Sequence, residues 1–202
     1  MEKNLKRLAT MQRIRSAGLA LFYKRGYFDT SIDDIISAIS LSKGAFYYHF
    51  KSKEEFLINI LENIVFHKVY SDLVASIEGQ KNPAVILEKC FDSALETAEH
   101  NDLDNGFVLS NFISEFNGKN ERVMKLLNEI VRVWEINLIA CLQKGKTDGY
   151  IDRHLDSEAA TSFLMSSYIG VRLLMVEGNS KLLRYKYMQQ LRSYLKTITV
   201  KQ

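Results

Sequence analysis

The residues best suited to chemistry lie between Ser42 and Lys53, where hydrogen-bonding rings stand next to basic side chains. Tyr47, Tyr48 and His49 are consecutive, and lysines flank them on both sides. Phenol, imidazole and ammonium groups gathered in one short segment are suited to contact phosphates and the edges of nucleobases. An ordinary solvated surface is the alternative interpretation.

The start of this segment carries very small side chains, because Gly44 and Ala45 follow Lys43. Glycine in a helix costs about 0.8–1.0 kcal/mol relative to alanine. In return it lets a bulky group, such as a phosphate or a thymine methyl, approach the backbone closely. We expect Ser42 to cap this helix, whose free amide groups and positive dipole end attract a phosphate oxygen.

The sequence offers no constellation typical of an enzyme: no Ser/His/Asp order, no glycine-rich phosphate loop and no clustered carboxylate pair. Cys90 and Cys141 lie far apart and lack the spacing of metal ligands. We therefore expect two buried free thiols, no metal and no other cofactor, in a protein that is not an enzyme.

Two short helices around a tight turn position these residues. An apolar stripe predicts a preceding helix from about residue 5 to 25, which Gly26 ends. Thr30 is the expected cap of the next helix, with Asp33 in its first turn. Phe46 and Phe50 are the expected core anchors of the helix that follows, and the layout is that of a helix-turn-helix unit.

The remainder also reads as helical, since the chain has one proline and 47% hydrophobic residues. Helices are predicted at about 52–76, 83–100, between 106 and 117, at 120–148, from 157 to about 177, and at 181–198. The predicted fold is all-α. An N-terminal helix-turn-helix domain, residues 1–51, joins a larger helical ligand-binding and dimerisation domain, residues 52–202.

The basic charge is concentrated at the N-terminus. The chain carries a net +3, of which residues 1–55 hold +4, and this asymmetry points to a polyanionic partner. Lys3, Lys6 and Arg7 fit a disordered basic tail better than an arm in the minor groove. The charged N-terminus and the short apolar segment around Arg172 predict a cytoplasmic protein without a membrane span.

The stretch 14–61 resembles the tetracycline-repressor (TetR) family, through Leu21-Phe22, Arg25-Gly26-Tyr27, Thr30-Ser31-Ile32-Asp33-Asp34-Ile35 and the run from Leu41 to Glu54. The turn at residues 39–41 departs from the family pattern, where a small residue or glycine is more usual. The resemblance implies that Lys43, Gly44, Ala45, Tyr48 and His49 face the major groove. It implies that Thr30, Ser42, Tyr47 and Lys53 hold flanking phosphates, with Ser31 in the same DNA-binding set.

Beyond residue 61 the chain resembles one branch of the family's ligand domains more loosely. Some members of that branch sense electrophiles through a cysteine where this chain has Phe107, which argues against a thiol sensor there. Aromatic and polar side chains in this part are typical of a small-molecule pocket, although an ordinary helical core uses the same residues. The candidate ligand-binding residues are His67, Phe91, Phe107, Ser110, Asn111, Phe112, Trp134 and Asn137.

Residues 156–198 are apolar on more than one face, which predicts a four-helix homodimer interface; an enclosed monomer core is the alternative. The candidate interface residues are Leu164, Val171, Leu174, Leu191, Tyr194 and Leu195. A twofold dimer would present two recognition helices to palindromic double-stranded operator DNA. We therefore expect a repressor released from its operator by a small-molecule effector, or alternatively a constitutive or architectural DNA-binding protein without a ligand.

Overall fold

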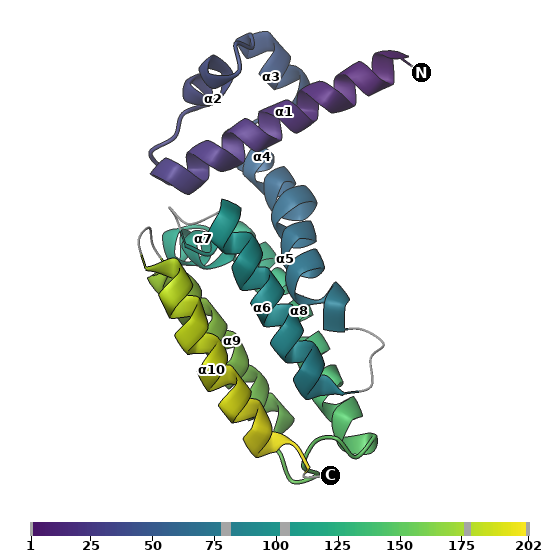
Figure 1. Cartoon of the computed structure of the whole chain (residues 1–202). Coiled ribbons are helices and arrows are strands. Elements are labelled where there is room, and N and C mark those ends of the chain that lie inside the picture. Colours follow the sequence, from purple (N-terminus) through teal and green to yellow (C-terminus); the bar gives the residue numbers. More distant parts are fainter. Residues whose placement is uncertain (1, 78–81, 102–105, 176–178, 201–202) are drawn as a thin grey trace.

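The computed structural model describes residues 2–77, 82–101, 106–175 and 179–200 of the chain (Figure 1). Its elements are α1 (Glu2–Arg25), α2 (Ile32–Ala38), α3 (Lys43–His49), α4 (Lys53–Ile60), the π-helical turn η1 (Leu61–Val65), α5 (Phe66–Leu73), the 3₁₀ turn η2 (Ala75–Ile77), α6 (Pro83–Asn101), α7 (Val108–Phe116), α8 (Glu121–Thr147), α9 (Ser157–Leu174) and α10 (Ser180–Ile198). Within these ranges the only β-type pairing is an isolated bridge between Ile151 and Thr199. The predicted all-helical fold is confirmed.

Helices α1 to α4 share a small aromatic core. The Phe56 ring of α4 lies 5.2 Å from Phe46, 4.8 Å from Phe50 and 5.9 Å from Phe22 between ring centroids. A Cβ atom on Gly18 would lie 2.3 Å from the Phe56 ring, so this glycine lets α4 pack closely against α1. Phe46 and Phe50 are buried, as expected, and they anchor α3 to this core.

The cap of α2 differs from the prediction by one residue. Ser31, not Thr30, is the N-cap: its Oγ accepts from the Asp34 amide at 3.0 Å, and the Asp34 carboxylate accepts from the Ser31 amide at 2.7 Å. Asp33 lies in the first turn, as predicted, and Asp34 occupies the third helical position that a reciprocal capping box requires. Thr30 instead donates its hydroxyl to the Gly26 carbonyl at 2.7 Å.

The helix predicted over residues 52–76 is not uniform. It begins as α4, widens into the π turn η1, in which the Phe66 amide donates to the Leu61 carbonyl five residues earlier, and continues as α5 and η2. Leu61 and Val65 are fully buried within this turn. The connection between the two halves of the molecule therefore contains an irregular turn of helix, visible between α4 and α5 in Figure 1.

Helices α5 to α10 form a bundle around the long helix α8, whose Leu127, Trp134 and Leu138 are fully buried. Helices α9 and α10 run side by side along one flank (Figure 1), where α10 packs on α6 and α9 packs on α8. A Cβ on Gly145 of α8 would lie 2.4 Å from the Pro83 ring, so this glycine lets the start of α6 pack closely on α8. No helix in the described ranges is long and apolar enough to cross a membrane.

Candidate functional site

Helix α3 buries one side and exposes a face rich in hydrogen-bonding groups. Phe46 is fully buried, whereas 47% of Tyr47 and 71% of Tyr48 are exposed. Ser42 caps the helix by accepting from the Ala45 amide at 3.2 Å, as predicted. Large aromatic side chains are seldom left this exposed without a partner, so this face has the character of a contact surface.

Gly44 lies in the middle of the exposed face. A Cβ atom placed there would meet nothing within 4 Å, and the backbone has ordinary helical geometry. The described part of the fold therefore does not require glycine at this position, unlike at Gly18. What the missing side chain provides is a bare surface for a group outside the protomer.

A shallow groove of about 460 Å³ joins the start of α2 to α3 and α4, and Ser31, Lys43, Tyr47 and Lys53 are among its lining residues. Three aspartates also line it, residues 29, 33 and 34. Their charge opposes an incoming phosphate. Two of the three are already engaged, one in the α2 cap and one with Lys43, which offsets part of that opposition.

The two lysines of this groove are held differently. Lys43 Nζ lies 2.9 Å from an Asp33 carboxylate oxygen, and this hydrogen bond raises the pKa of Lys43. Lys53 Nζ lies 4.1 Å above the centre of the Tyr27 ring, where burial lowers the pKa of Lys53. Lys43 is thus held by a carboxylate, whereas Lys53 is held over an aromatic ring.

His49 ends α3 with its ring partly covered. Its Nδ1 atom is buried and has no hydrogen-bond partner among the described residues. Burial, and secondarily the positive charge of Arg7, lowers the pKa of His49. The neutral imidazole packs against the Tyr48 ring at 5.0 Å between centroids, so the two rings form one edge of the exposed face.

Nine of the ten expected DNA-binding residues are exposed or partly exposed on α3 and the adjoining ends of α2 and α4: Ser31, Ser42, Lys43, Gly44, Ala45, Tyr47, Tyr48, His49 and Lys53. Thr30 is the exception. It is 1% exposed, and its hydroxyl is used within the fold. The structure gives Thr30 a role in holding the loop before α2, and that loop positions the groove.

The N-terminal and C-terminal halves touch through polar contacts that the sequence did not reveal. The Phe28 amide donates to the Glu115 carboxylate at 3.0 Å, and Asn120 donates to Glu54 at 2.9 Å. The Tyr23 hydroxyl donates to the backbone carbonyl of Gly106, just before α7. These contacts link α1, the loop after it and α4 to the ends of α7 and α8.

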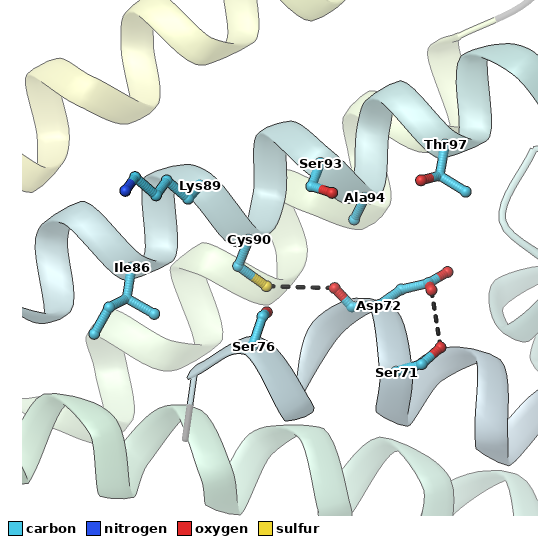
Figure 2. A pocket seen from close by; sticks show the side chains of 9 residues that line it. All are labelled: Ser71, Asp72, Ser76, Ile86, Lys89, Cys90, Ser93, Ala94 and Thr97. Atoms are coloured by element: carbon cyan, nitrogen blue, oxygen red, sulfur yellow. Dashed lines mark hydrogen bonds between the residues drawn. The ribbon is translucent and has the colours of Figure 1, made fainter. Parts of the chain in front are cut away.

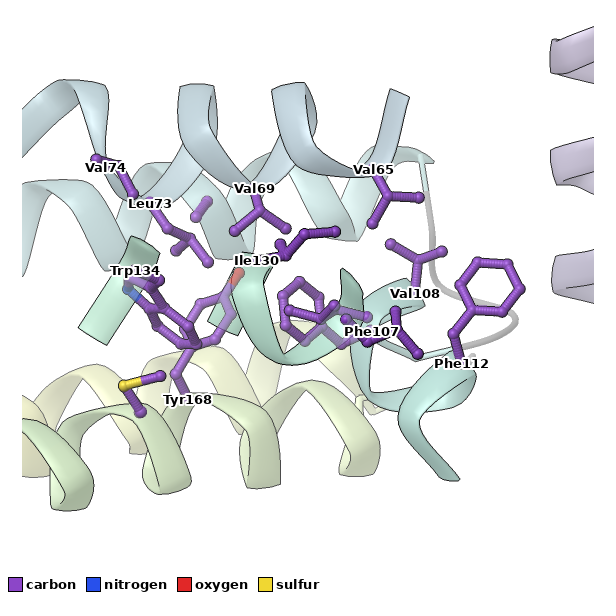
Figure 3. Packing of buried hydrophobic residues seen from close by; sticks show 14 of the residues in the cluster. Val65, Val69, Leu73, Val74, Phe107, Val108, Phe112, Ile130, Trp134 and Tyr168 are labelled. Carbon is purple, nitrogen blue, oxygen red and sulfur yellow. The ribbon is translucent and has the colours of Figure 1, made fainter. Parts of the chain in front are cut away.

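An aromatic cluster occupies the centre of the C-terminal half (Figure 3). The Tyr168 ring lies 5.2 Å from Phe91, 5.7 Å from Phe107 and 5.6 Å from Trp134 between centroids. Three of the candidate ligand-binding residues are therefore brought together around a tyrosine that was not among them. All four rings are buried. Phe91 lies on α6, Phe107 directly precedes α7, Trp134 lies on α8 and Tyr168 lies on α9.

The other candidate ligand-binding residues lie apart from this cluster or are already engaged. Phe112 is buried, with its ring near Phe116 at 6.5 Å. Ser110 donates to the Phe107 carbonyl at 2.8 Å and Asn137 donates to the Val133 carbonyl at 2.7 Å. Asn111 is partly buried, whereas His67 is exposed on α5.

A polar groove of about 310 Å³ separates α5 and η2 from α6 (Figure 2). Cys90 lies in it, with Sγ 3.4 Å from the Asp72 carbonyl oxygen. Burial raises the pKa of Cys90 and raises that of Cys141 to about 11. Both cysteines are free, as expected, although Cys141 is only partly buried, and both stay protonated thiols of low reactivity at neutral pH.

The structure corrects the predicted dimer residues. Leu164, Val171, Leu191 and Leu195 are at most 5% exposed and belong to the protomer's own core. The enclosed-core alternative thus holds for these four. The remaining two lie outward: Leu174 is 61% exposed, and Tyr194 is partly exposed.

An apolar outer face remains on α9 and α10. Phe163 is 52% exposed, and its ring packs against that of Tyr194 at 4.6 Å between centroids. A groove of about 320 Å³ runs beside them. Between Glu158 and Arg172 helix α9 has no charged residue, so its solvent-facing side consists of small and apolar side chains.

Comparison with known proteins matches both halves of the chain to one family. Residues 14–60 match the model described as "Bacterial regulatory proteins, tetR family", and residues 85–185 match "Tetracyclin repressor-like, C-terminal domain". The repressor DhaR of a Mycobacterium species is 29% identical over 175 residues, covering 86% of each chain.

Two solved structures show the same fold. A TetR transcriptional regulator from Chloroflexus aurantiacus superposes with a TM-score of 0.86 at 23% identity, covering 96% of this chain and 98% of the other. A TetR-family regulator from Cytophaga hutchinsonii gives a TM-score of 0.80 at 22% identity, covering 98% of each. The layout of a small helical unit joined to a larger helical bundle is therefore shared along the whole chain.

Proposed function

Since this chain belongs to the TetR family of bacterial transcriptional regulators, we propose that it is a homodimeric repressor. It holds palindromic double-stranded operator DNA through α3 and releases that DNA when a small molecule binds among the C-terminal helices. The observation that carries the DNA-binding part is the exposed face of α3, where Gly44 is bare and Tyr48 is 71% exposed.

The groove-reading edge consists of Lys43, Gly44, Ala45, Tyr48 and His49, and it enters the major groove. The flanking phosphates are held by Ser31, Ser42, Tyr47 and Lys53 around the groove at the start of α2. Phosphate contacts set position and affinity, while base-edge contacts set sequence preference. The two groups of residues should therefore respond differently to a change in DNA sequence.

The outer face of α9, which carries no charged residue between Glu158 and Arg172, supports the proposal that the protein dimerises. Phe163, Leu173 and Leu174 are each more than half exposed there. Pairing this face with its twofold copy buries these side chains in a four-helix contact and sets the distance between two α3 helices. Tyr194, whose ring packs against Phe163, belongs to the same contact.

Release requires a ligand that binds more tightly to a dimer whose α3 helices are wrongly spaced for DNA. By linkage the ligand then weakens DNA binding by the factor by which DNA weakens ligand binding. The contacts of Phe28 with Glu115 and of Tyr23 with Gly106 support this coupling, because they join the DNA-binding helices directly to the bundle.

The direct test is selection of bound duplexes from a random DNA pool by the purified protein. We expect a palindromic consensus, bound at one dimer per site. Tyr48→Ala should alter the selected sequence, while Asn128→Ala, an exposed change on α8, should leave it unchanged. If no consensus emerges, the protein is not a sequence-specific regulator. If a consensus emerges but no compound releases the DNA, the constitutive alternative is correct.

A further inference from the structure

A buried arginine that has no counter-charge among the described residues lies beside the central aromatic cluster. Arg172 of α9 is 2% exposed. Its Nη2 donates to the Gly106 carbonyl at 2.7 Å, and its Nη1 is buried with no hydrogen-bond partner among the described residues. Burying a charge this deeply is costly unless an opposite charge joins it. The described residues supply no carboxylate within ion-pair distance of Arg172.

The space next to this guanidinium is a small, partly open cavity. Its lining includes Arg172, Tyr168 and Phe107, and toward its outer end Lys68 and Asp72, whose charged groups lie 3.4 Å apart. Since that pair is mutually neutralised, the net charge of the lining comes from Arg172. The Trp134 ring packs on Tyr168, and its Nε1 is a second buried donor without a partner in the described structure. Both donors require an acceptor.

The cavity measures only about 10 Å³, which is room for roughly one water molecule. A ligand must therefore open it. The polar groove beside Cys90 shares Asp72 and Ala94 with the cavity, so the two spaces adjoin between α5 and α6. Separation of α5 from α6 at this seam would provide an entry path from solvent.

We infer that the effector of this protein is a small organic acid, whose carboxylate pairs with Arg172 and whose apolar body lies among Phe91, Phe107, Trp134 and Tyr168. This inference rests on the proposed function. A guanidinium fork matches the two oxygens of a carboxylate, and the aromatic rings provide the apolar walls typical of ligand pockets. A neutral ligand would leave the charge of Arg172 unpaired.

Binding at Arg172 also has a direct route to the DNA-binding half. The Gly106 carbonyl accepts from both Arg172 and Tyr23, and so it connects the cavity to α1 through a single backbone atom. A carboxylate that draws the guanidinium toward itself weakens the bond from Arg172 to Gly106. The position of that carbonyl, and with it the anchoring of Tyr23, then depends on whether the acid is bound.

The chain carries its own reporter, because Trp134 is its only tryptophan and lies in the cluster. Tryptophan fluorescence of the full-length protein would be titrated with benzoate and hexanoate, and with benzamide and hexanamide as uncharged partners of matched shape. We expect at least one acid to bind at least about tenfold more tightly than its amide, because a charge-assisted hydrogen bond contributes a difference of that size. Chloride and phosphate would be titrated as inorganic anions.

Arg172→Met should remove the preference for the acid over its amide. Arg184→Met is the matched control, since Arg184 is also mostly buried but pairs with Asp92 at 2.8 Å on the α6 side of α10, away from the cavity. That variant should keep the preference. Because Arg172→Met removes a buried charge that has no counter-ion among the described residues, it should melt no lower than the wild type, which a merely structural arginine would not allow.

The inference is overturned if neither acid binds better than its amide, or if only chloride and phosphate bind and the site holds a simple counter-ion. It is also overturned if Arg172→Met keeps the acid preference. Should that variant fail to fold, the acid and amide titrations of the wild type decide alone. Failure of the proposed function is separable, because it would appear as loss of sequence-specific DNA binding in the absence of any acid.

Discussion

Replacement of Gly44 by alanine should separate the stability of the protein from its DNA binding. The added methyl meets nothing within 4 Å in the free protein, and the backbone is already helical. The variant should therefore gain about 0.8–1.0 kcal/mol of folding free energy from helix propensity. For a chain of this size that corresponds to a rise of roughly 2–4 °C in melting temperature.

The same methyl should obstruct the DNA complex. Forcing one extra carbon into a close-packed contact costs about 1–3 kcal/mol, which is roughly a 5- to 150-fold loss of affinity. Fluorescence anisotropy with the selected duplex would measure that loss, and thermal unfolding would measure the gain. Asn128→Ala on the exposed side of α8 is the control: it should also raise stability and leave DNA affinity unchanged. Undiminished DNA affinity in Gly44→Ala would refute the placement of α3 against DNA.

Five further substitutions test other parts of the molecule. Lys53→Ala should weaken binding to all duplexes and reduce the salt slope by about one, measured by anisotropy between low and moderate salt; an unchanged slope would exclude a phosphate contact. Leu174→Glu should give folded monomers by analytical ultracentrifugation, and a dimeric Leu174→Glu would argue against the α9/α10 interface. Leu164→Ala, a change in the buried core, should instead lower the unfolding free energy by about 2–5 kcal/mol. Because the pKa of His49 is lowered in the folded protein, protonation favours the unfolded chain, and stability should fall as the pH drops below about 6.5. Urea midpoints measured over this pH range should change less steeply in His49→Gln. An equally steep change in the variant would exclude His49 as the cause. Tyr23→Phe should leave the binding of benzoate or hexanoate intact but reduce the factor by which the acid weakens DNA binding, and an unaltered factor would exclude the Gly106 route.

Local signals were sufficient to predict most helix ends. Ser42 caps α3 as expected, Ser52 caps α4 at the predicted helix start, and Asn120 caps α8 by accepting from the Val123 amide at 3.0 Å. Gly26 ends α1 in the left-handed conformation, with φ of 88°. Caps and stops depend on a few neighbouring residues, and so they can be recognised in the sequence.

The orientation of α9 was harder to predict because it is apolar on all sides. Leu164, Tyr168 and Arg172 recur every four residues and face inward, while Phe163 and Leu174 face outward. Either face has the composition of a core, so periodicity alone did not decide between dimer contact and protomer interior. The four-residue spacing of Leu164, Tyr168 and Arg172 was the available signal. It would have placed Tyr168 and Arg172 on the same inward face as Leu164.

The turn of the helix-turn-helix unit shows a different limit of sequence reasoning. Ser40 occupies the left-handed region with φ of 52°, at the place where the family more usually has a small residue or glycine. The neighbouring Leu41 amide closes the turn by donating to the Ile36 carbonyl at 2.9 Å. The surrounding contacts thus hold an L-residue in a conformation that its own preferences disfavour, which no local propensity would predict.

The π turn η1 sets the helical register between α4 and α5, and so the orientation of the two halves depends on it. Five residues, Leu61 to Val65, form a turn that an α-helix would close with one residue fewer. Conversion of this turn to regular helix shifts the register by one residue, which corresponds to a rotation of about 100° and a rise of about 1.5 Å. Deletion of the exposed Asn63 would favour that conversion and turn α4 relative to α5. The length of this turn therefore determines the direction in which the whole N-terminal unit points.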